Sequence, residues 1–281
     1  MPKKILLFFL ILSLNISVYG QKKDKIKGNR NVTSQQTPIN SFNKIVVGED
    51  FYVDIIEGQQ ASVFVETDDN LHDIIQFTVA DSVLTFTTTK KITTRKKLSI
   101  KVVYTNTLSE IETVDNGEIS SLTSINLDNV VVKSSGASRA FLNVKSQTFD
   151  FSSKERARVK LNVTANESKF EMSDNSKLDA LIESDRMTID TYQRSDAKVR
   201  GNLDKLKVRS SNSSKIEGKD LATVNCELLV EDSSDVTVNV ANELFVDLSG
   251  SGEVFIYNEP KITLNNFTGT SKLHKKELSN Q

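Results

Sequence analysis

The sequence predicts an all-β protein, a right-handed parallel β-helix (β-solenoid) of about nine rungs of about 19 residues, behind an irregular N-terminal β cap. Three observations support this prediction. The sequence repeats with a period near 19 residues, apolar and polar residues alternate within each repeat, and a small residue recurs at one position of every repeat.

The repeat is clearest in two Leu-Asn-Val triplets, 142–144 and 161–163, which lie 19 residues apart. Extending this register gives one small residue per repeat at Gly117, Ser138, Ala157, Ser176, Ser195, Ser214, Ser234, Gly252 and Ser271. We call these residues the anchors. Small, polar and glycine-rich segments beside them are typical of sharp turns.

Apolar residues follow most anchors at the second and fourth positions, as Val159 and Leu161 do, while Arg158 and Lys160 stand between them. This period of two indicates a strand with one buried face. One such repeat cannot bury its own apolar face, so stacking of successive rungs is expected. A β-sandwich of antiparallel hairpins is the alternative, because turns about ten residues apart also fit it.

The chain begins with the pattern of a secretory signal peptide over residues 1–20. Lys3 and Lys4 precede an apolar run over 5–14, and Val18-Tyr19-Gly20 resembles a cleavage site. A membrane anchor or a core helix is the alternative. Residues 21–40 are polar and lysine-rich without periodicity, which predicts a disordered linker or, alternatively, a basic tether.

The remaining chain divides into three parts. Residues 41–107 contain alternating segments, such as 51–55 and 98–102, that do not keep the 19-residue register, and they are predicted to form the β cap. Residues 108–273 are expected to form the regular solenoid, and 274–281 a charged tail. A cap is required because an open strand edge would recruit another chain.

Composition and motifs give little support for nucleic-acid binding, catalysis, cofactor binding or metal binding. The formal net charge of −1 argues against a nucleic-acid partner. The sequence has two histidines and a single cysteine, Cys226, and no catalytic, phosphate-binding or metal-binding motif is found. We therefore expect no catalytic, cofactor-binding or metal-binding residue, no cofactor and no enzymatic activity.

One local cluster of positive charge stands out between two predicted strands. Five cations occur within eight residues, namely Lys90, Lys91, Arg95, Lys96 and Lys97. An exposed loop of this kind is a candidate site for anionic glycans or lipopolysaccharide phosphates. The alternative is a hairpin tip whose charges only keep the protein soluble.

The segments 42–55, 81–86 and 248–254 resemble the putative auto-transporter adhesin, head GIN domain family, which is common in Bacteroidetes. The resemblance covers nearly the whole chain after the predicted signal peptide, although the Gly-Ile-Asn tripeptide is absent. It implies an exported β-helical domain of a bacterial envelope with a role in adhesion. It implies no catalytic or ligand residue.

These observations predict a non-catalytic, adhesin-like binding or structural surface module. We expect it in the periplasm, on the outer-membrane surface or secreted, with no membrane span after signal removal. Its expected partner is a surface ligand, either a glycan or an envelope protein. Two alternatives stay open: a carbohydrate-active β-helix enzyme (polysaccharide lyase or hydrolase) and a periplasmic protein-interaction module.

Overall fold

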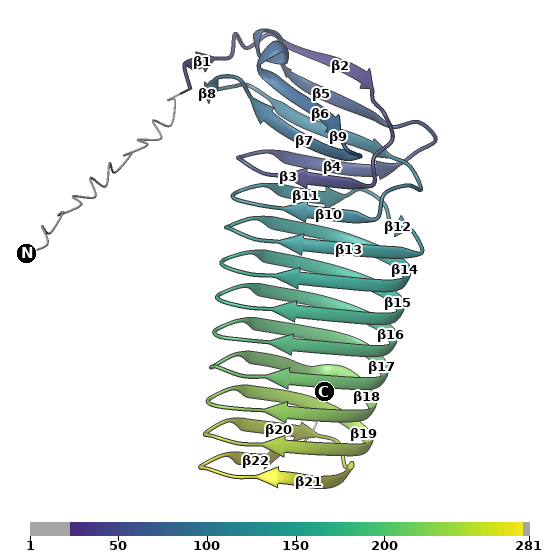
Figure 1. Ribbon diagram of the computed structural model, residues 1–281, viewed down its shortest axis with the longest axis vertical. Helices are drawn as coiled ribbons and strands as arrows, with labels where there is room; N and C mark the ends of the chain where they lie inside the picture. Colours follow the sequence, from purple (N-terminus) through teal and green to yellow (C-terminus); the bar gives the residue numbers. More distant parts are fainter. Residues whose placement is uncertain (1–22, 278–281) are drawn as a thin grey trace, which may run out of the picture.

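The computed structural model describes residues 23–277, so the predicted signal peptide, 1–20, lies outside the described residues. The chain forms a column of stacked coils with a differently built head at the N-terminal end (Figure 1). Strands account for 67% of the chain, and the coils make about nine turns that wind in the right-handed sense, which confirms the predicted β-solenoid.

Each regular coil is one long strand that bends midway and is followed by a tight turn. These strands are β14 (Arg139–Ser153), β15 (Arg158–Met172), β16 (Lys177–Thr191), β17 (Asp196–Ser210), β18 (Lys215–Val230) and β19 (Asp235–Leu248). Each pairs in parallel with the next coil, and from β14 to β17 every pair is offset by 19 residues, as in Leu142↔Leu161 and Leu161↔Ala180. The sequence repeat is therefore the length of one coil.

Shorter strands form the coils at the two ends of this stack. On the head side these are β10 (Glu110–Thr113), β11 (Glu118–Ser121), β12 (Ile125–Asn126) and β13 (Asn129–Ser134). On the other side β20 (Glu253–Tyr257), β21 (Lys261–Phe267) and β22 (Lys272–Lys275) complete the described chain. We call the coil formed by β21 and β22 the tail.

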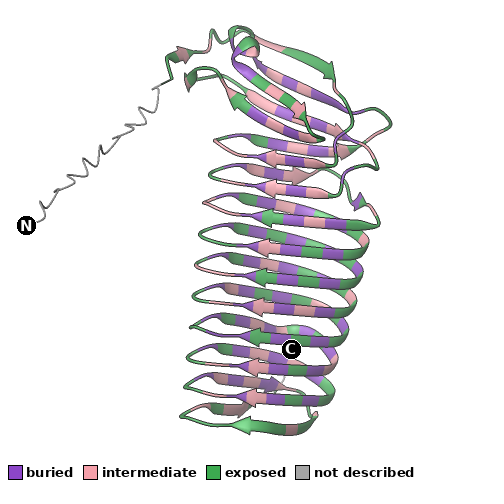
Figure 2. Ribbon diagram, in the orientation of Figure 1, coloured by how far each residue is buried: buried purple, intermediate pink, exposed green. Residues whose placement is uncertain are grey.

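The core is a set of apolar columns enclosed between the two faces of the flattened coils. Buried and exposed residues alternate along every long strand (Figure 2). The ring centroids of Phe149 and Phe151 lie 5.6 and 5.5 Å from the ring centroid of Phe170 in the next coil. Because each inward side chain is covered by its equivalents above and below, burial is a property of the stack and not of a single coil.

The anchors line the inside of the tight turns, where space is smallest. Ser138, Ala157, Ser176, Ser195, Ser214 and Ser234 are at most 1% exposed. Ser176 and Ser195 donate hydrogen bonds to the carbonyl oxygens of Ser173 and Tyr192, at 2.8 and 2.9 Å. A small side chain is thus required because two strands and the next coil converge there.

A second column of turn residues adopts positive φ two positions before the anchors. Its members are Asp115, Gly136, Glu155, Asp174, Gln193, Asn212, Asp232, Gly250 and Gly269. Their side chains also link the coils: the Asp174 carboxylate accepts the Glu155 N–H at 3.0 Å, and the Gln193 amide oxygen accepts the Asp174 N–H at 2.8 Å. Polar residues can therefore occupy these positive-φ positions in place of glycine, because their side chains accept a hydrogen bond from a backbone N–H of the neighbouring coil.

The head places further strands above the first coil. β3 (Lys44–Val47) and β4 (Tyr52–Glu57) form that coil, stacked on β10 and β11. Above it lie β7 (Val83–Thr88) and β9 (Leu98–Tyr104), while β5 (Ser62–Asp68) and β6 (Ile75–Ala80) pair antiparallel with them. A short 3-10 helix, Asp69–Ile74, joins β5 to β6.

The prediction of a disordered linker over 21–40 was wrong for its described part. Residues Lys25–Lys27 form β1, which pairs with β8 (Lys91–Thr94), and Val32–Pro38 form β2, which pairs antiparallel with β5. An edge strand needs only backbone donors and acceptors on its neighbour, so a polar segment can join the sheet without an apolar period.

Substitution at one anchor tests the packing account. Ser195→Leu places a large side chain in the closed turn and is expected to lower the free energy of unfolding by about 3 kcal/mol or more. Ser195→Ala loses one hydrogen bond and should cost about 1 kcal/mol. The exposed control Thr164→Leu should change stability little. Denaturant unfolding of the three variants checks this order, and an unchanged Ser195→Leu protein would contradict it.

Candidate functional site

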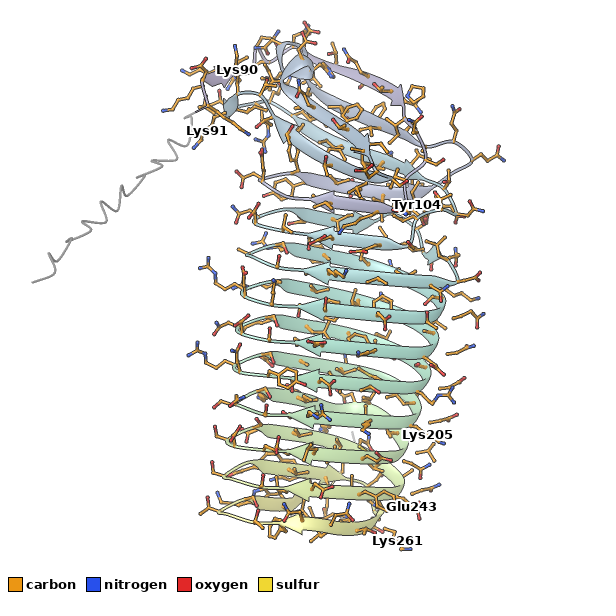
Figure 3. All side chains as sticks on the ribbon, in the orientation of Figure 1. Lys90, Lys91, Tyr104, Lys205, Glu243 and Lys261 are labelled. Atoms are coloured by element: carbon orange, nitrogen blue, oxygen red, sulfur yellow. The ribbon has the colours of Figure 1, made fainter. Side chains whose placement is uncertain are left out.

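The five cations predicted as an anion site lie on the connection between β7 and β9, which contains β8. All five side chains are exposed. Lys90 and Lys91 project outward from the side of the head, away from the column (Figure 3). The structure therefore brings the predicted residues together on one exposed edge; that they bind an anion stays a prediction.

The pairing of β1 with β8 adds cations that lie far away in the sequence. Lys25 is the register partner of Lys91, and Ile26 is the partner of Ile92. The Thr93 hydroxyl donates to the Ile26 carbonyl oxygen at 3.0 Å. Together these strands form a basic surface that we call the head cluster: Lys23, Lys25, Lys27, Lys90, Lys91, Arg95, Lys96 and Lys97.

Most of this charge is not neutralised by residues 23–277. Lys23 pairs with Glu49 at 2.9 Å and Lys97 with Glu66 at 2.7 Å. The other six cations make no ion pair with any residue of 23–277. The cluster therefore has a surplus of positive charge. Like charges on neighbouring strands repel, and an anionic ligand would reduce this repulsion.

One buried carboxylate holds the two basic segments in place. Asp68, at the end of β5, is fully buried and accepts the backbone N–H groups of Arg30 and Lys96, both at 3.0 Å, and of Lys97 at 3.3 Å. Burial alone raises the pKa of this carboxyl, but the three N–H donors and the charge of Lys96 together hold the pKa below its ordinary value. Asp68 therefore positions the cluster as an anion.

A cavity of about 370 Å³ lies between the head cluster and the first coil. Phe51, Ile92 and Leu98 supply apolar surface, and Lys23, Lys91 and Arg95 supply positive charge. Glu49 and Asp50 also line this cavity. Of the five predicted residues, Lys91 and Arg95 face it, whereas the other three belong to the outer surface.

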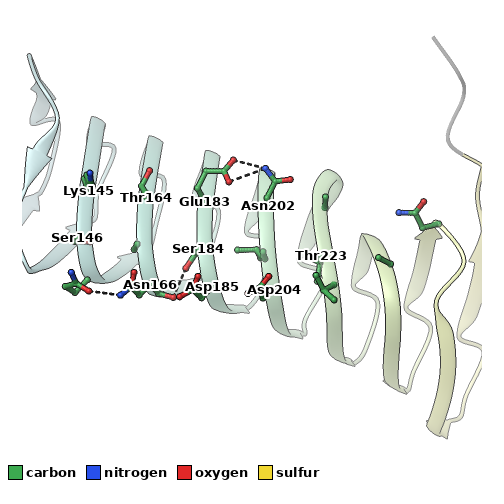
Figure 4. A pocket seen from close by; sticks show the side chains of 17 residues that line it. Lys145, Ser146, Thr164, Asn166, Glu183, Ser184, Asp185, Asn202, Asp204 and Thr223 are labelled. Atoms are coloured by element: carbon green, nitrogen blue, oxygen red, sulfur yellow. Dashed lines mark hydrogen bonds between the residues drawn. The ribbon is translucent and has the colours of Figure 1, made fainter.

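A groove of about 610 Å³, lined by polar and apolar side chains, follows the bends of successive coils (Figure 4). Some of its polar side chains bond to each other from coil to coil. The Asn166 amide donates to the Gln147 oxygen at 2.6 Å, and the Asn202 amide donates to both oxygens of Glu183 at 3.0 and 3.2 Å. These contacts link neighbouring coils along the groove.

Two side chains that could act as nucleophiles, Cys226 and Tyr104, are buried. No cluster of three or more His, Cys, Asp or Glu side chains among the described residues could hold a metal ion. Cys226 is buried, and burial, followed by the charge of Glu227, raises the pKa of its thiol. Burial likewise raises the pKa of the Tyr104 hydroxyl to about 12, with a smaller contribution from Glu57. Both groups are therefore protonated at neutral pH and poor nucleophiles.

The family described as "putative auto-transporter adhesin, head GIN domain" matches this chain over residues 41–181 and 147–260. The chain belongs to this family. A search of curated proteins finds no match. Within the described residues, no helix is long and apolar enough to cross a membrane.

Solved structures share the fold at low sequence identity. A putative adhesin from Parabacteroides distasonis ATCC 8503 has a TM-score of 0.64 and 18% identity, over 91% of this chain and 100% of that one. A putative adhesin from Parabacteroides merdae ATCC 43184 has a TM-score of 0.61 and 16% identity, over 90% and 99%. A putative lipid binding protein from P. distasonis ATCC 8503 has a TM-score of 0.54 and 16% identity, over 90% and 100%.

Two features of this site could not be found in the sequence: the β1 lysines and the buried carboxylate of Asp68. The β1 lysines were assigned to a linker because their pairing with β8 leaves no periodic pattern. Asp68 lies in the polar run Thr67-Asp68-Asp69-Asn70, where nothing distinguishes a buried acid from a solvated one. The high density of lysine and arginine at 90–97 was the only sequence feature that indicated this basic surface.

Replacing Asp68 tests its positioning role. Because the folded pKa is lowered, the carboxylate stabilises the head above its unfolded pKa, and this contribution is lost as the pH falls through the folded value. Asp68→Asn should therefore lower the unfolding temperature at neutral pH, and the difference from the parent protein should shrink in acid. The neighbouring control Asp69→Asn should have little effect. A difference independent of pH would contradict this role.

Proposed function

We propose that this protein is an exported, non-catalytic binding module of the cell envelope, whose head cluster contacts a phosphate- or carboxylate-bearing polymer. The observation that carries this proposal is the surplus of exposed cations collected from two distant segments. Exposed ammonium and guanidinium groups bind such anions through charge-assisted hydrogen bonds.

The solenoid differs from the head in its electrostatics, which supports a division of roles. Along its faces, opposite charges from neighbouring coils lie near each other: Lys198 and Glu217 at 3.8 Å, and Lys207 and Glu227 at 3.7 Å. This pairing reduces the local surplus of charge on these faces, which can act as a regular spacer or flat contact surface. About nine coils spaced about 4.8 Å apart extend roughly 40 Å, which separates the head from the tail.

Export is supported by the signal-peptide pattern at 1–20 and by the adhesin description of the family. The ligand chemistry is compatible with glycans that carry acidic groups and with lipid phosphates. One structural relative is described as a putative lipid binding protein, which is a statement about that protein. A phosphate headgroup would meet the same cations as a phosphorylated glycan.

The proposed site predicts selective binding of polyanions. The parent protein should bind polyphosphate and polygalacturonate but not neutral dextran, as measured by isothermal titration. Substituting the five cations of 90–97 by Gln should weaken polyphosphate binding roughly 60-fold, at about 0.5 kcal/mol for each exposed cation.

The matched control removes four lysines and one arginine from the solenoid: Arg158, Lys160, Lys169, Lys205 and Lys215. All five are exposed, and the change in net charge is the same. This variant should bind polyphosphate almost as well as the parent protein. Equal losses in the two variants would show that binding follows net charge and not the head cluster, and would contradict the proposal.

A further inference from the structure

The cavity of about 370 Å³ between the head cluster and the first coil has an apolar wall beside its cations. Phe51, Ile92 and Leu98 form this wall. Phe51 is 2% exposed, and its ring centroid lies 5.8 Å from that of Phe86 in the core of the head. Ile92 and Leu98 are half-buried and pack against the same core. The apolar wall is therefore held in place by the packed interior of the head.

The two sides of the cavity come from strands that do not pair with each other. β1 and β8 form a two-stranded sheet of their own, separate from the 20-stranded sheet that contains β4 and β9. Ile92 belongs to β8, whereas Leu98 begins β9 and Phe51 directly precedes β4. Backbone pairing therefore does not draw these two sides together, and space remains between their side chains.

The charged residues at the cavity favour an anionic ligand. Glu49 pairs with Lys23 at 2.9 Å, and Asp50 accepts a hydrogen bond from a side-chain amide at 3.2 Å. Lys91 and Arg95 also line the cavity, and neither forms an ion pair with any residue of 23–277. An anionic group placed here can therefore receive charge-assisted hydrogen bonds from two cations that have no other partner among these residues.

We propose that this cavity binds the apolar chain of an amphipathic anion, whose phosphate or carboxylate contacts Lys91 and Arg95. This inference rests on the anion-binding function proposed for the head cluster, and it names the part of the ligand that adjoins the anionic group. A hydrophilic polymer can contact the cations but gains nothing from the apolar wall. An alkyl or acyl chain leaves water when it enters the cavity, while a few polar groups fix its orientation.

The occupant is a single amphiphile and not a membrane surface. Binding to a membrane surface buries an exposed apolar face in the lipid. Here Phe51 is buried and Ile92 and Leu98 are half-buried, and none of the large exposed apolar side chains of residues 23–277 lines the cavity. The chain of the ligand must therefore enter the protein.

The affinity for a series of alkyl phosphates tests the proposal. Butyl, hexyl and octyl phosphate, each below its micelle-forming concentration, are titrated calorimetrically into the chain without its predicted signal peptide, residues 21–281. Each added methylene should tighten binding about two- to fourfold, because the cavity removes it from water. Replacing both Lys91 and Arg95 by Gln should weaken all three ligands about fivefold and leave the dependence on chain length unchanged.

Removal of the apolar wall should abolish the dependence on chain length. Ile92→Gln leaves the net charge unchanged and should weaken octyl phosphate binding about tenfold, while polyphosphate binding stays within about twofold of the parent protein. The matched control Ile262→Gln, at a residue 40% exposed on β21, should keep the full dependence. If hydrogen exchange shows that Ile92→Gln separates β1 from β8, Leu98→Gln on β9 provides the same test.

Three results would overturn the proposal: a flat series in the parent protein, a dependence on chain length that survives Ile92→Gln with β1 and β8 still paired, or a dependence that is lost in Ile262→Gln. The polyphosphate titration separates these results from the function of the head cluster. Polyphosphate binding together with a flat alkyl series would remove only the amphiphile. Failure of the parent protein to bind polyphosphate would instead contradict the proposed function.

Discussion

Parallel pairing between successive coils at a nearly constant offset is the constraint on which the structure depends. A single coil cannot bury its apolar side chains alone, so every core residue is covered by its equivalents in adjacent coils. The constant offset also fixes which side chains meet at the turns. Asp174 can accept a hydrogen bond from the Glu155 N–H only because these residues are one coil apart.

The same constraint makes the two ends of the stack different from its middle. At the head, β7 and β9 cover the first coil, the antiparallel strands extend from them to the polar edge strand β2, and Asp68 binds the backbone of the basic segments. At the tail, β21 keeps core residues such as Leu264 but has no strand below it within the described chain. The candidate site therefore lies at the head, while several charges on the stacked faces pair between coils.

The repeating part of the fold could be predicted from sequence because stacking requires like residues at a fixed spacing. The serine anchors, the alternation around Val159 and Leu161, and the polar turns each leave such a pattern. β1 and β2 could not be predicted, because edge pairing uses the backbone and leaves no period. The local charge at 90–97 was visible, but the contribution of Lys25 depends on a pairing between distant segments.

We propose that β1 and β8 form one anion-binding surface on a head held by the stack. The most direct test is the affinity for polyphosphate of a Lys25→Gln, Lys27→Gln variant, which leaves the predicted loop at 90–97 intact. We predict a loss of about 5-fold, near 1 kcal/mol for two exposed cations. An affinity equal to that of the parent protein, with β1 still paired to β8 by hydrogen exchange, would contradict the account.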